Sequence, residues 1–409
     1  MVVRREQVYV RRRRIAALLV LVLVVGLIST VRWAWGAVTG DEAAVATVAA
    51  PKPRPTPSTI VPSASQGPLG NPAETTPVRI RRLTGDLASK SVVASKGGQV
   101  FAQNMMYEHT VAVFDADGER TATINDAVDL AAYGITGHDG QSKGAPVEMA
   151  FSPDGKTAWV SNYHMFGRGF SPEPKDACEG PGDSSNSFVY KIDVATNAIA
   201  KVVEVGVVPK YVEVTPDGGR VLVTNWCSMD VSVIDTSTDQ VVKTVPTTGK
   251  HPRGIAVHPD GHTAYIANMG SDSIVALDLA TYEVRPFAQP GKRTRHLNIS
   301  PDGSRLYATN SASDNVSEID TRTGEVLRSV TVGAEPRSMA ISPDGGALYV
   351  VNYEGSSMTK IRASDMTVMG TYRVDGQPIG ITYEPTSKRV WVACYGGSII
   401  LFDDSRLAA

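Results

Sequence analysis

Five basic residues stand at equivalent places in the sequence, each five residues before a recurring turn sequence related to Ser-Pro-Asp-Gly. They are Lys90, Lys210, Arg253, Arg295 and Arg337. Residues 1–14 carry +5 while the whole chain carries −2, so the rest of the chain is acidic. If the fold brings the five positions together, their positive charge is concentrated within this acidic part. Such a group attracts a carboxylate, a phosphate or an acidic polymer. In the alternative interpretation, each cation pairs with a neighbouring carboxylate or carbonyl and only holds the structure together.

Large side chains in the predicted loops next to these cations offer a second set of candidates. Aromatic residues on loops are typical of contact surfaces, although they also pack between neighbouring loops. The set consists of Tyr163, His164, Trp226, Tyr353 and Tyr395. We predict that these residues and the five cations share one ligand-binding face.

An enzymatic alternative is a lactonase-like hydrolase that holds an anionic substrate on the cations. Hydrolysis would need a general acid or base nearby. The candidates are Glu148 and His296. Each stands one residue after the repeat position that holds a cation in five of the units. On a regular strand this offset turns a side chain to the opposite face, so the sequence favours a binding module over a hydrolase.

A redox or metal role is the third hypothesis. His109, His138 and His164 fall in predicted loops of one face, and three His side chains can bind Zn²⁺ or Cu²⁺. Their spacing matches no metal motif, and the chain has no Cys-x-x-Cys-His haem-attachment sequence. We therefore predict no metal and no cofactor. The acidic body also argues against a nucleic-acid partner.

The turn sequence that follows each cation belongs to a long-period repeat. Copies begin at 215, 258, 300, 342 and 384, spaced by 42 or 43 residues, and earlier copies begin at 95 and 152. Each unit contains four short strand-like stretches, for example 253–257, 262–268, 273–278 and 283–288. A period near 42 residues with four strands per unit is typical of a β-propeller. The sequence therefore predicts an all-β, seven-bladed β-propeller with four-stranded blades, and the cations begin the innermost strand of five blades.

The two ends of the repeat region complement each other. The last unit stops after its third strand, 398–402, and segment 78–83 (Val-Arg-Ile-Arg-Arg-Leu) is similar to the fourth strand of other units. We predict that 78–83 completes the last blade and closes the ring.

The units resemble the YVTN-type propeller repeat. The resemblance rests on Ala-Tyr-Ile-Ala-Asn at 264–268, Leu-Tyr-Ala-Thr-Asn at 306–310 and Leu-Tyr-Val-Val-Asn at 348–352. It covers 78–409 and implies the propeller fold. It implies no single function, because similar propellers serve as surface-layer and adhesion modules, lactonase-like enzymes and redox subunits.

The N-terminal part predicts a membrane anchor. Residues 1–14 form a basic tail with six Arg, 15–35 hold an apolar run long enough for one bilayer crossing, and 36–77 form a Pro-rich linker. Because positive charge stays on the cytoplasmic side, we expect a single-pass cell-membrane protein with a cytoplasmic N-terminus and an extracytoplasmic propeller at 78–409. A signal peptide cleaved near 44–46 is the alternative, and both interpretations export the propeller.

Two insertions, 125–145 and 163–187, extend loops on the face that carries the cations, and long loops in a compact fold are often functional. Cys178 in the second insertion falls near Cys227 of the next unit, and we predict a disulfide between them. The leading hypothesis is a non-enzymatic binding or scaffolding module at the cell envelope. Its partners are the membrane, through the N-terminal helix, and either an anionic small molecule or polymer or a protein.

Overall fold

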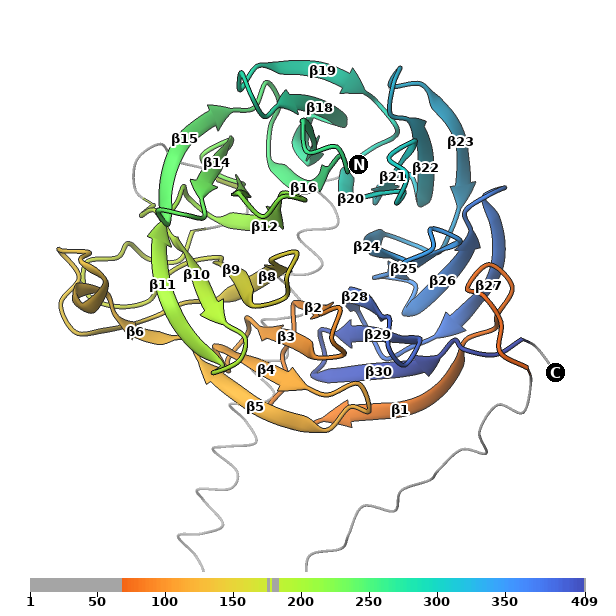
Figure 1. Cartoon of the computed structure of the whole chain (residues 1–409), viewed down its shortest axis with the longest axis horizontal. Helices are drawn as coiled ribbons and strands as arrows, with labels where there is room; N and C mark the ends of the chain where they lie inside the picture. Colours follow the sequence, from red (N-terminus) through yellow and green to blue (C-terminus); the bar gives the residue numbers. More distant parts are fainter. Residues whose placement is uncertain (1–67, 175–176, 179–183, 408–409) are drawn as a thin grey trace, which may run out of the picture. The chain divides into compact units, whose positions relative to one another are not determined.

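Seven antiparallel sheets stand around a common axis in the computed structural model, which describes residues 68–174, 177–178 and 184–407 (Figure 1). Each of the seven has four strands, and this confirms the predicted seven-bladed propeller. The predicted basic tail and membrane span, 1–35, lie outside the described residues. Within the part that is described, no helix is both long and apolar enough to cross a bilayer.

The blades follow the sequence repeats, with the first strand of each repeat innermost (Figure 1). Blade 1 consists of β2 (Ser91–Ala94), β3 (Val100–Asn104), β4 (Thr110–Phe114) and β5 (Arg120–Asn125). Blade 2 consists of β8 (Pro146–Phe151), β9 (Thr157–Asn162), β10 (Phe188–Asp193) and β11 (Ala198–Glu204). Blade 3 consists of β12 (Pro209–Val214), β13 (Arg220–Asn225), β14 (Asp230–Asp235) and β15 (Gln240–Pro246).

The remaining blades repeat the same order of strands. Blade 4 consists of β16 (Pro252–Val257), β17 (Thr263–Asn268), β18 (Ser273–Asp278) and β19 (Val284–Ala288), with the short helix η2 (Met269–Ser271) after β17. Blade 5 consists of β20 (Thr294–Ile299), β21 (Arg305–Asn310), β22 (Asn315–Asp320) and β23 (Val326–Thr331). Blade 6 consists of β24 (Pro336–Ile341), β25 (Ala347–Asn352), β26 (Ser357–Arg362) and β27 (Thr367–Arg373). Blade 7 consists of β28 (Pro378–Glu384), β29 (Arg389–Cys394), β30 (Ser398–Asp403) and the N-terminal β1 (Val78–Thr84).

The ring closes through β1, as the sequence predicts. This strand pairs antiparallel with β30, from Val78 opposite Asp403 to Thr84 opposite Ser398 (Figure 1). The described end of the predicted linker, 68–77, also contacts the propeller, because Thr75 pairs with Leu407 just beyond the last strand. Because β1 pairs with β30, the outer edge of β30 is covered and blade 7 has four strands like the other blades.

A buried ion pair fastens this closure. Lys360 of β26 and Asp404, which follows β30, are both 0% exposed, and Lys360 Nζ lies 2.8 Å from each carboxylate oxygen. The ammonium group also donates to the carbonyl and hydroxyl oxygens of Thr75 at 2.8 and 2.9 Å. One lysine therefore joins blade 6, the C-terminal end of blade 7 and the segment before β1.

The Pro-Asp-Gly turns have the geometry that their residue types favour. In the fifth copy, Asp302 Oδ1 accepts a hydrogen bond from the backbone N–H of Ser304 at 3.0 Å, and Gly303 has φ +76°. Asp302 therefore closes the turn with its side chain, while Gly303 supplies a conformation that other residues adopt only with strain. In the degenerate last copy, the carboxylate of Glu384 accepts from the backbone N–H groups of Thr386 and Ser387 instead.

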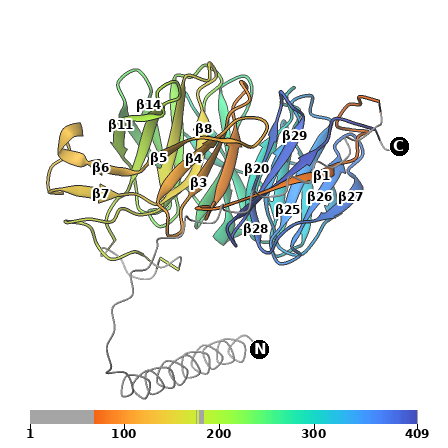
Figure 2. The ribbon, with the colours of Figure 1, turned by 90° about the horizontal axis from the view of Figure 1, so that it is seen from below.

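The first insertion stands beside the ring (Figures 1 and 2). It contains β6 (Ala127–Asp129), the short helix η1 (Leu130–Tyr133) and β7 (Gln141–Lys143), and β6 and β7 pair antiparallel. Val128 and Leu130 pack with Met165 of the second insertion in one apolar cluster. The two insertions therefore support each other.

Candidate functional site

An irregularity at the start of the innermost strand sets the direction of the candidate side chains. In blades 2 to 7 the pairing of the first two strands shifts there, as between Thr294 and His296 of β20. Such a bulge interrupts the alternation of a strand and re-aims a side chain. Two cavities lie along the central channel, an upper one where the inner strands begin and a lower one toward the Pro-Asp-Gly turns. Arg295 and His296 are adjacent in sequence, yet Arg295 lines the upper cavity and His296 lines the lower one.

In blades 3 to 6 the backbone just before the bulge is strained in the same way. Val208, His251, Arg293 and Glu335 have φ between +55° and +58°, in the left-handed region. Side chains other than glycine adopt this conformation at a cost of about 1–3 kcal/mol, and such strain clusters at functional sites. In each of these blades the strained residue stands two positions before a predicted basic residue. The strain therefore recurs next to the side chains that line the channel.

The upper cavity lies where the inner strands begin and has a volume of about 490 Å³. Its lining contains five basic side chains and one carboxylate, namely Lys210, Arg253, Arg293, Arg295, Arg337 and Asp272. Four of the five are predicted cations, and they come from four consecutive blades. Lys90, the remaining predicted cation, is not in the lining, but its charge interacts with Arg253, Arg295 and Lys210.

Burial and mutual repulsion act on the charges of this group. Burial lowers the pKa of Lys90 well below its ordinary value, and Arg253 and Arg295 lower it further, whereas Glu148 opposes the change. Burial, followed by Arg253 and Arg337, lowers the pKa of Arg295. Holding several like charges in poorly solvated space costs free energy. An anion in the cavity would recover part of that cost.

Arg337 fits the alternative interpretation, in which a cation stabilises its own surroundings. Its Nε and Nη2 lie 3.0 and 2.7 Å from Glu335 Oε1. Its guanidinium carbon lies 3.2 Å from the ring centroid of Tyr353, and Tyr353 meets Tyr395 edge to face at 6.4 Å. These two aromatic residues therefore position Arg337 at the edge of the cavity.

Tyr163 and Trp226 are only 5% and 7% exposed, which fits the alternative of packing between neighbouring loops, and Trp226 also lines the upper cavity. The ammonium nitrogen of Lys210 lies 4.2 Å from the ring centroid of Tyr163 and 5.4 Å from that of Trp226. Trp226 also stacks on His251, with 4.5 Å between ring centroids. Both aromatic rings hold Lys210 beside the cavity through cation–π contacts.

His164 lies away from the cations, in the core of the second insertion. It is 1% exposed, contacts Phe166 and Phe170, and has Nε2 3.0 Å from the carbonyl oxygen of Ser171. Burial lowers the pKa of this imidazole. His164 lines neither channel cavity, so the structure places it apart from the cations with which it was predicted to share a face.

The other histidines proposed as metal ligands have local partners. His109 Nδ1 lies 2.6 Å from the carbonyl oxygen of Gly144, and His138 stacks on Phe170 at 4.0 Å. Across residues 68–174, 177–178 and 184–407, no three His, Cys, Asp or Glu side chains gather closely enough to hold a metal ion.

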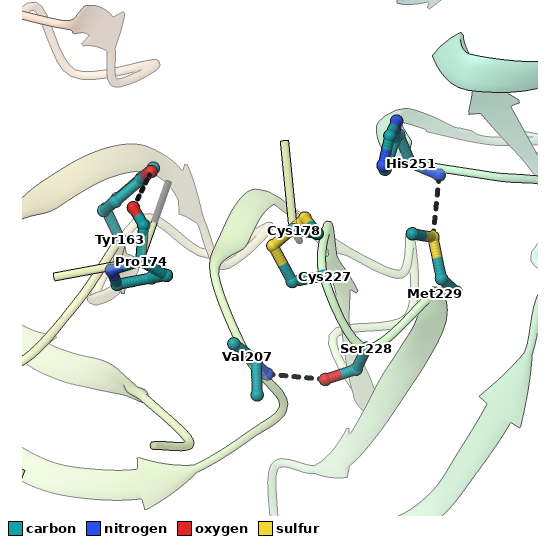
Figure 3. Close-up of a disulfide and its surroundings, with 8 residues drawn as sticks. All are labelled: Tyr163, Pro174, Cys178, Val207, Cys227, Ser228, Met229 and His251. Carbon is teal, nitrogen blue, oxygen red and sulfur yellow. Dashed lines mark hydrogen bonds between the residues drawn. A yellow bond between two sulfur atoms is a disulfide. The ribbon is translucent and has the colours of Figure 1, made fainter. Parts of the chain in front are cut away.

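A disulfide between Cys178 and Cys227 ties the second insertion to blade 3 (Figure 3). On the side of blade 2, the Tyr163 hydroxyl donates to the carbonyl oxygen of Pro174 at 3.0 Å (Figure 3). Ala177, the neighbour of Cys178, lines the upper cavity. Part of the cavity wall therefore belongs to the insertion, and the disulfide fixes it in place.

The lower cavity continues the channel toward the face of the Pro-Asp-Gly turns and has a volume of about 480 Å³. Glu148, Tyr211, Glu213 and His296 line it. The expectation that Glu148 and His296 turn away from the channel is therefore wrong, and the bulge is the reason. Burial lowers the pKa of His296 to about 3, which leaves the imidazole neutral near pH 7.

Two carboxyl groups of the lower cavity have raised pKa values. Burial raises the pKa of Glu213 to about 8. Burial also raises the pKa of Glu148, while Lys90 and Arg253 oppose the change. A carboxyl group with a raised pKa beside several cations is a candidate for proton transfer.

His251, Arg293 and Asp272 also line the upper cavity, and they are not among the residues predicted from sequence. The first two stand two residues before Arg253 and Arg295, and aligning the repeats slightly further upstream would have included them. Asp272 follows η2, and Asp314 stands at the equivalent place 42 residues later. Both carboxylates accept a hydrogen bond from the backbone N–H of the strained residue before the next blade, Arg293 or Glu335, so the repeat also indicates this position.

Comparisons with known proteins agree with the architecture. A family model described as "Lactonase, 7-bladed beta-propeller" matches residues 238–330. The solved hydrazine synthase of Kuenenia stuttgartiensis is similar, with a TM-score of 0.61, 18% identity, and coverage of 78% of this chain and 96% of that one. The chain has a propeller fold. Virginiamycin B lyase from Staphylococcus aureus superimposes with a TM-score of 0.57 and 13% identity, covering 79% of this chain and 98% of that one.

No curated protein sequence matches the chain. Sequence identities of 18% and 13% support a shared fold but no shared function, because propellers of one architecture perform unrelated tasks. Evidence for the function therefore comes from the residues of the channel.

Proposed function

We propose that the propeller binds an anionic ligand in the upper cavity and acts as a binding module rather than an enzyme. The observation that carries this proposal is the lining of five basic side chains against one carboxylate. The burial of Arg253 and Arg295, which are 6% and 9% exposed, supports it further. Charge-assisted hydrogen bonds to guanidinium groups are strongest where water is largely excluded.

The arrangement of the cations favours a ligand with more than one negative charge. Lys210, Arg253, Arg295 and Arg337 come from four consecutive blades, so they form an arc around one side of the channel. A cavity of about 490 Å³ falls in the size range of small-molecule sites. A dicarboxylate, a sugar phosphate or the acidic end group of a polymer would fit this chemistry.

We further propose that this binding takes place outside a bacterial-type membrane. The six Arg before the apolar run at 15–31 support this orientation, as does the disulfide, which is typical of oxidising compartments. Protease treatment of intact cells tests the topology. We expect the propeller to be degraded in intact cells, and a propeller that becomes accessible only after lysis would contradict the proposal.

Calorimetric titration tests the anion site. Succinate, citrate and pyrophosphate should bind more tightly than acetate, and the affinity should fall with ionic strength because charges are screened. Each charge-assisted hydrogen bond contributes about 1.5–3 kcal/mol, so Arg295→Gln should weaken binding roughly ten- to hundred-fold. The triple variant Arg253→Gln, Arg295→Gln and Arg337→Gln should abolish it.

A matched control separates the site from general charge. Arg322 is exposed and lies outside the cavity lining, so Arg322→Gln removes the same charge and should leave the affinity unchanged. Melting curves show whether the triple variant is folded. A folded triple variant that binds as tightly as the wild type would refute the site.

A hydrolase is the second candidate, and Glu148 is the observation that favours it. This carboxyl group has a raised pKa and interacts with Lys90, Arg253 and Arg295. The partial match to the lactonase propeller model points in the same direction. Turnover of anionic lactones that disappears in Glu148→Gln would support the hydrolase, and absence of turnover across such a panel would exclude it for those substrates.

A further inference from the structure

The lower cavity is a second space in the channel. Its volume is about 480 Å³, and its lining residues come from every blade except blade 4. None of these described residues lines the upper cavity. A cavity of this size falls in the range of small-molecule sites. The lower cavity can therefore hold a ligand without using the side chains of the anion site.

The charges of this cavity differ from those of the upper one. Among the described residues that line it, the only Lys or Arg is Lys96, which is exposed on the turn at 95–98. Glu148 and Glu213 bring two carboxyl groups to the lining. Lys90 and Arg253 interact with Glu148, so cations compensate its charge. The carboxyl group of Glu213 therefore decides which ligand charge the cavity favours.

Glu213 has no counter-charge in the part of the chain that the structure describes. Its side chain lines the cavity but makes no ion pair or hydrogen bond with the described residues, and no cation opposes the effect of burial on its pKa. A carboxyl group in poorly solvated space without a partner is costly, and proteins usually pair such groups. A positively charged ligand group in the cavity would supply this partner.

The neighbours of Glu213 in the cavity suit an ammonium group. Tyr211, two residues earlier on β12, also lines the cavity, and its ring meets that of His296 edge to face with 5.2 Å between centroids. Asn298 stands two residues after His296 on β20, and its Oδ1 has no hydrogen-bond partner in the described structure. Glu213 and Asn298 each stand two residues before the turn of their blade, so they line the cavity at a similar depth. Carboxylate and amide oxygens accept hydrogen bonds from N–H groups, and aromatic rings attract cations.

We propose that the lower cavity binds a small primary ammonium compound, with the charged nitrogen between Glu213, Asn298 and Tyr211. Its N–H groups donate hydrogen bonds to the carboxylate and amide oxygens, and the Tyr211 ring faces the charge. Phe151 and Ile381 line the same cavity and offer apolar surface to a short carbon chain. A metal ion fits less well, because no three His, Cys, Asp or Glu side chains within the described residues gather closely enough to hold one. The proposal does not depend on the anion site.

Calorimetric titration of the full chain with butylammonium chloride tests the proposal. At about pH 8.5 an alkylammonium group keeps its charge, because its pKa resembles the value of about 10.4 for lysine. Most Glu213 carboxyl groups are ionised at this pH, since burial raises their pKa to about 8. Butanol has the same carbon chain without the charge and should bind at least about tenfold more weakly, because it forms no charge-assisted hydrogen bond with both partners.

Two variants with the same change of charge locate the site. Glu213→Gln keeps the shape of the side chain and should weaken butylammonium binding about ten- to hundred-fold, the loss expected for one charge-assisted hydrogen bond. Glu325 is exposed and lies outside the lining, so Glu325→Gln should leave the affinity unchanged. Melting curves show whether the variants are folded. Unchanged affinity in a folded Glu213→Gln, or butanol binding as tightly as butylammonium, would overturn the proposal.

A crystal soak tests the site without any variant. The soaked ligand is 3-bromopropylammonium, which carries the same charged group, and the anomalous scattering of bromine locates it. We expect its nitrogen within hydrogen-bond distance of Glu213 and Asn298, and a soaked crystal whose lower cavity holds no ligand would overturn the proposal. The two sites can fail separately, because citrate titration reports on the upper cavity. If citrate binds and butylammonium does not, the ammonium site falls and the anion site stands.

Discussion

The closure of the ring depends on Lys360, and Lys360→Met removes its charge with little change in length. In the native chain the ammonium nitrogen lies 2.8 Å from both carboxylate oxygens of Asp404 and donates to Thr75 at 2.8 and 2.9 Å. The Tyr349 hydroxyl donates a further hydrogen bond to Asp404. In the variant the carboxylate stays buried without its cation, while Thr75 loses a donor.

The size of the effect follows from the complete burial of the pair. Both Lys360 and Asp404 side chains are 0% exposed, and breaking such a pair on one side costs about 3–5 kcal/mol. The double variant Lys360→Met, Asp404→Leu also removes the stranded charge and should recover most of this loss, because apolar replacement of a whole buried pair is often neutral. Lys156 and Asp154 form an exposed pair at 3.8 Å, and Lys156→Met should cost less than about 1 kcal/mol.

The assay is denaturant unfolding of the four proteins, followed in parallel by tryptophan fluorescence and circular dichroism. Coincident transitions would allow the free energy of unfolding to be compared between variants. If Lys360→Met were no more destabilising than Lys156→Met, or if the double variant were as unstable as the single one, the role assigned to this ion pair would be refuted.

Three further properties can be tested on the fold and the insertions. Burial raises the pKa of Asp126 to about 8, so the folded chain keeps a proton that the unfolded chain loses above about pH 4, and stability contributed by this group is lost as the pH rises toward 8. Asp126→Asn should therefore flatten the decrease of melting temperature between pH 5 and 8, and an unchanged slope would contradict the assignment. Reductant should remove about 2–4 kcal/mol of stability through the Cys178–Cys227 bond, whereas the Cys178→Ser, Cys227→Ser variant should melt at the same temperature with and without reductant. A chain that begins at Pro68 should give a monomeric size-exclusion peak, whereas one that begins at Gly85 lacks β1 and should aggregate through the edge of β30, and equal behaviour of the two would be evidence against closure by β1.

The architecture could be predicted because its signals are local and repeated. A turn such as Ser300 to Gly303 is specified by its own residues, and the spacing of the copies fixes the number of blades. The closing strand was also visible in sequence, because the last repeat lacks one strand and 78–83 supplies a matching segment.

The positions of the cations could be predicted from the same periodicity, but the direction of their neighbours could not. Strand alternation placed Glu148 and His296 on the face away from the channel, whereas the bulge before them turns both into the lower cavity. The burial of Tyr163 and Trp226 depends on how an insertion packs over them, and no repeat pattern describes an insertion.

The buried ion pair depends on contacts between distant parts of the chain. Lys360 and Thr75 are 285 residues apart, and neither has an unusual position in the repeat. Only the closed ring brings them together, so the sequence of either segment gives no sign of the contact.

The central claim is that the upper cavity is an anion site, and a crystal structure with selenate tests it most directly. Selenate is a tetrahedral dianion, and the anomalous scattering of selenium locates it without ambiguity. We predict a selenate in the upper cavity within hydrogen-bond distance of the guanidinium groups of Arg253 and Arg295. Selenate bound at other surfaces while this cavity holds none would contradict the account.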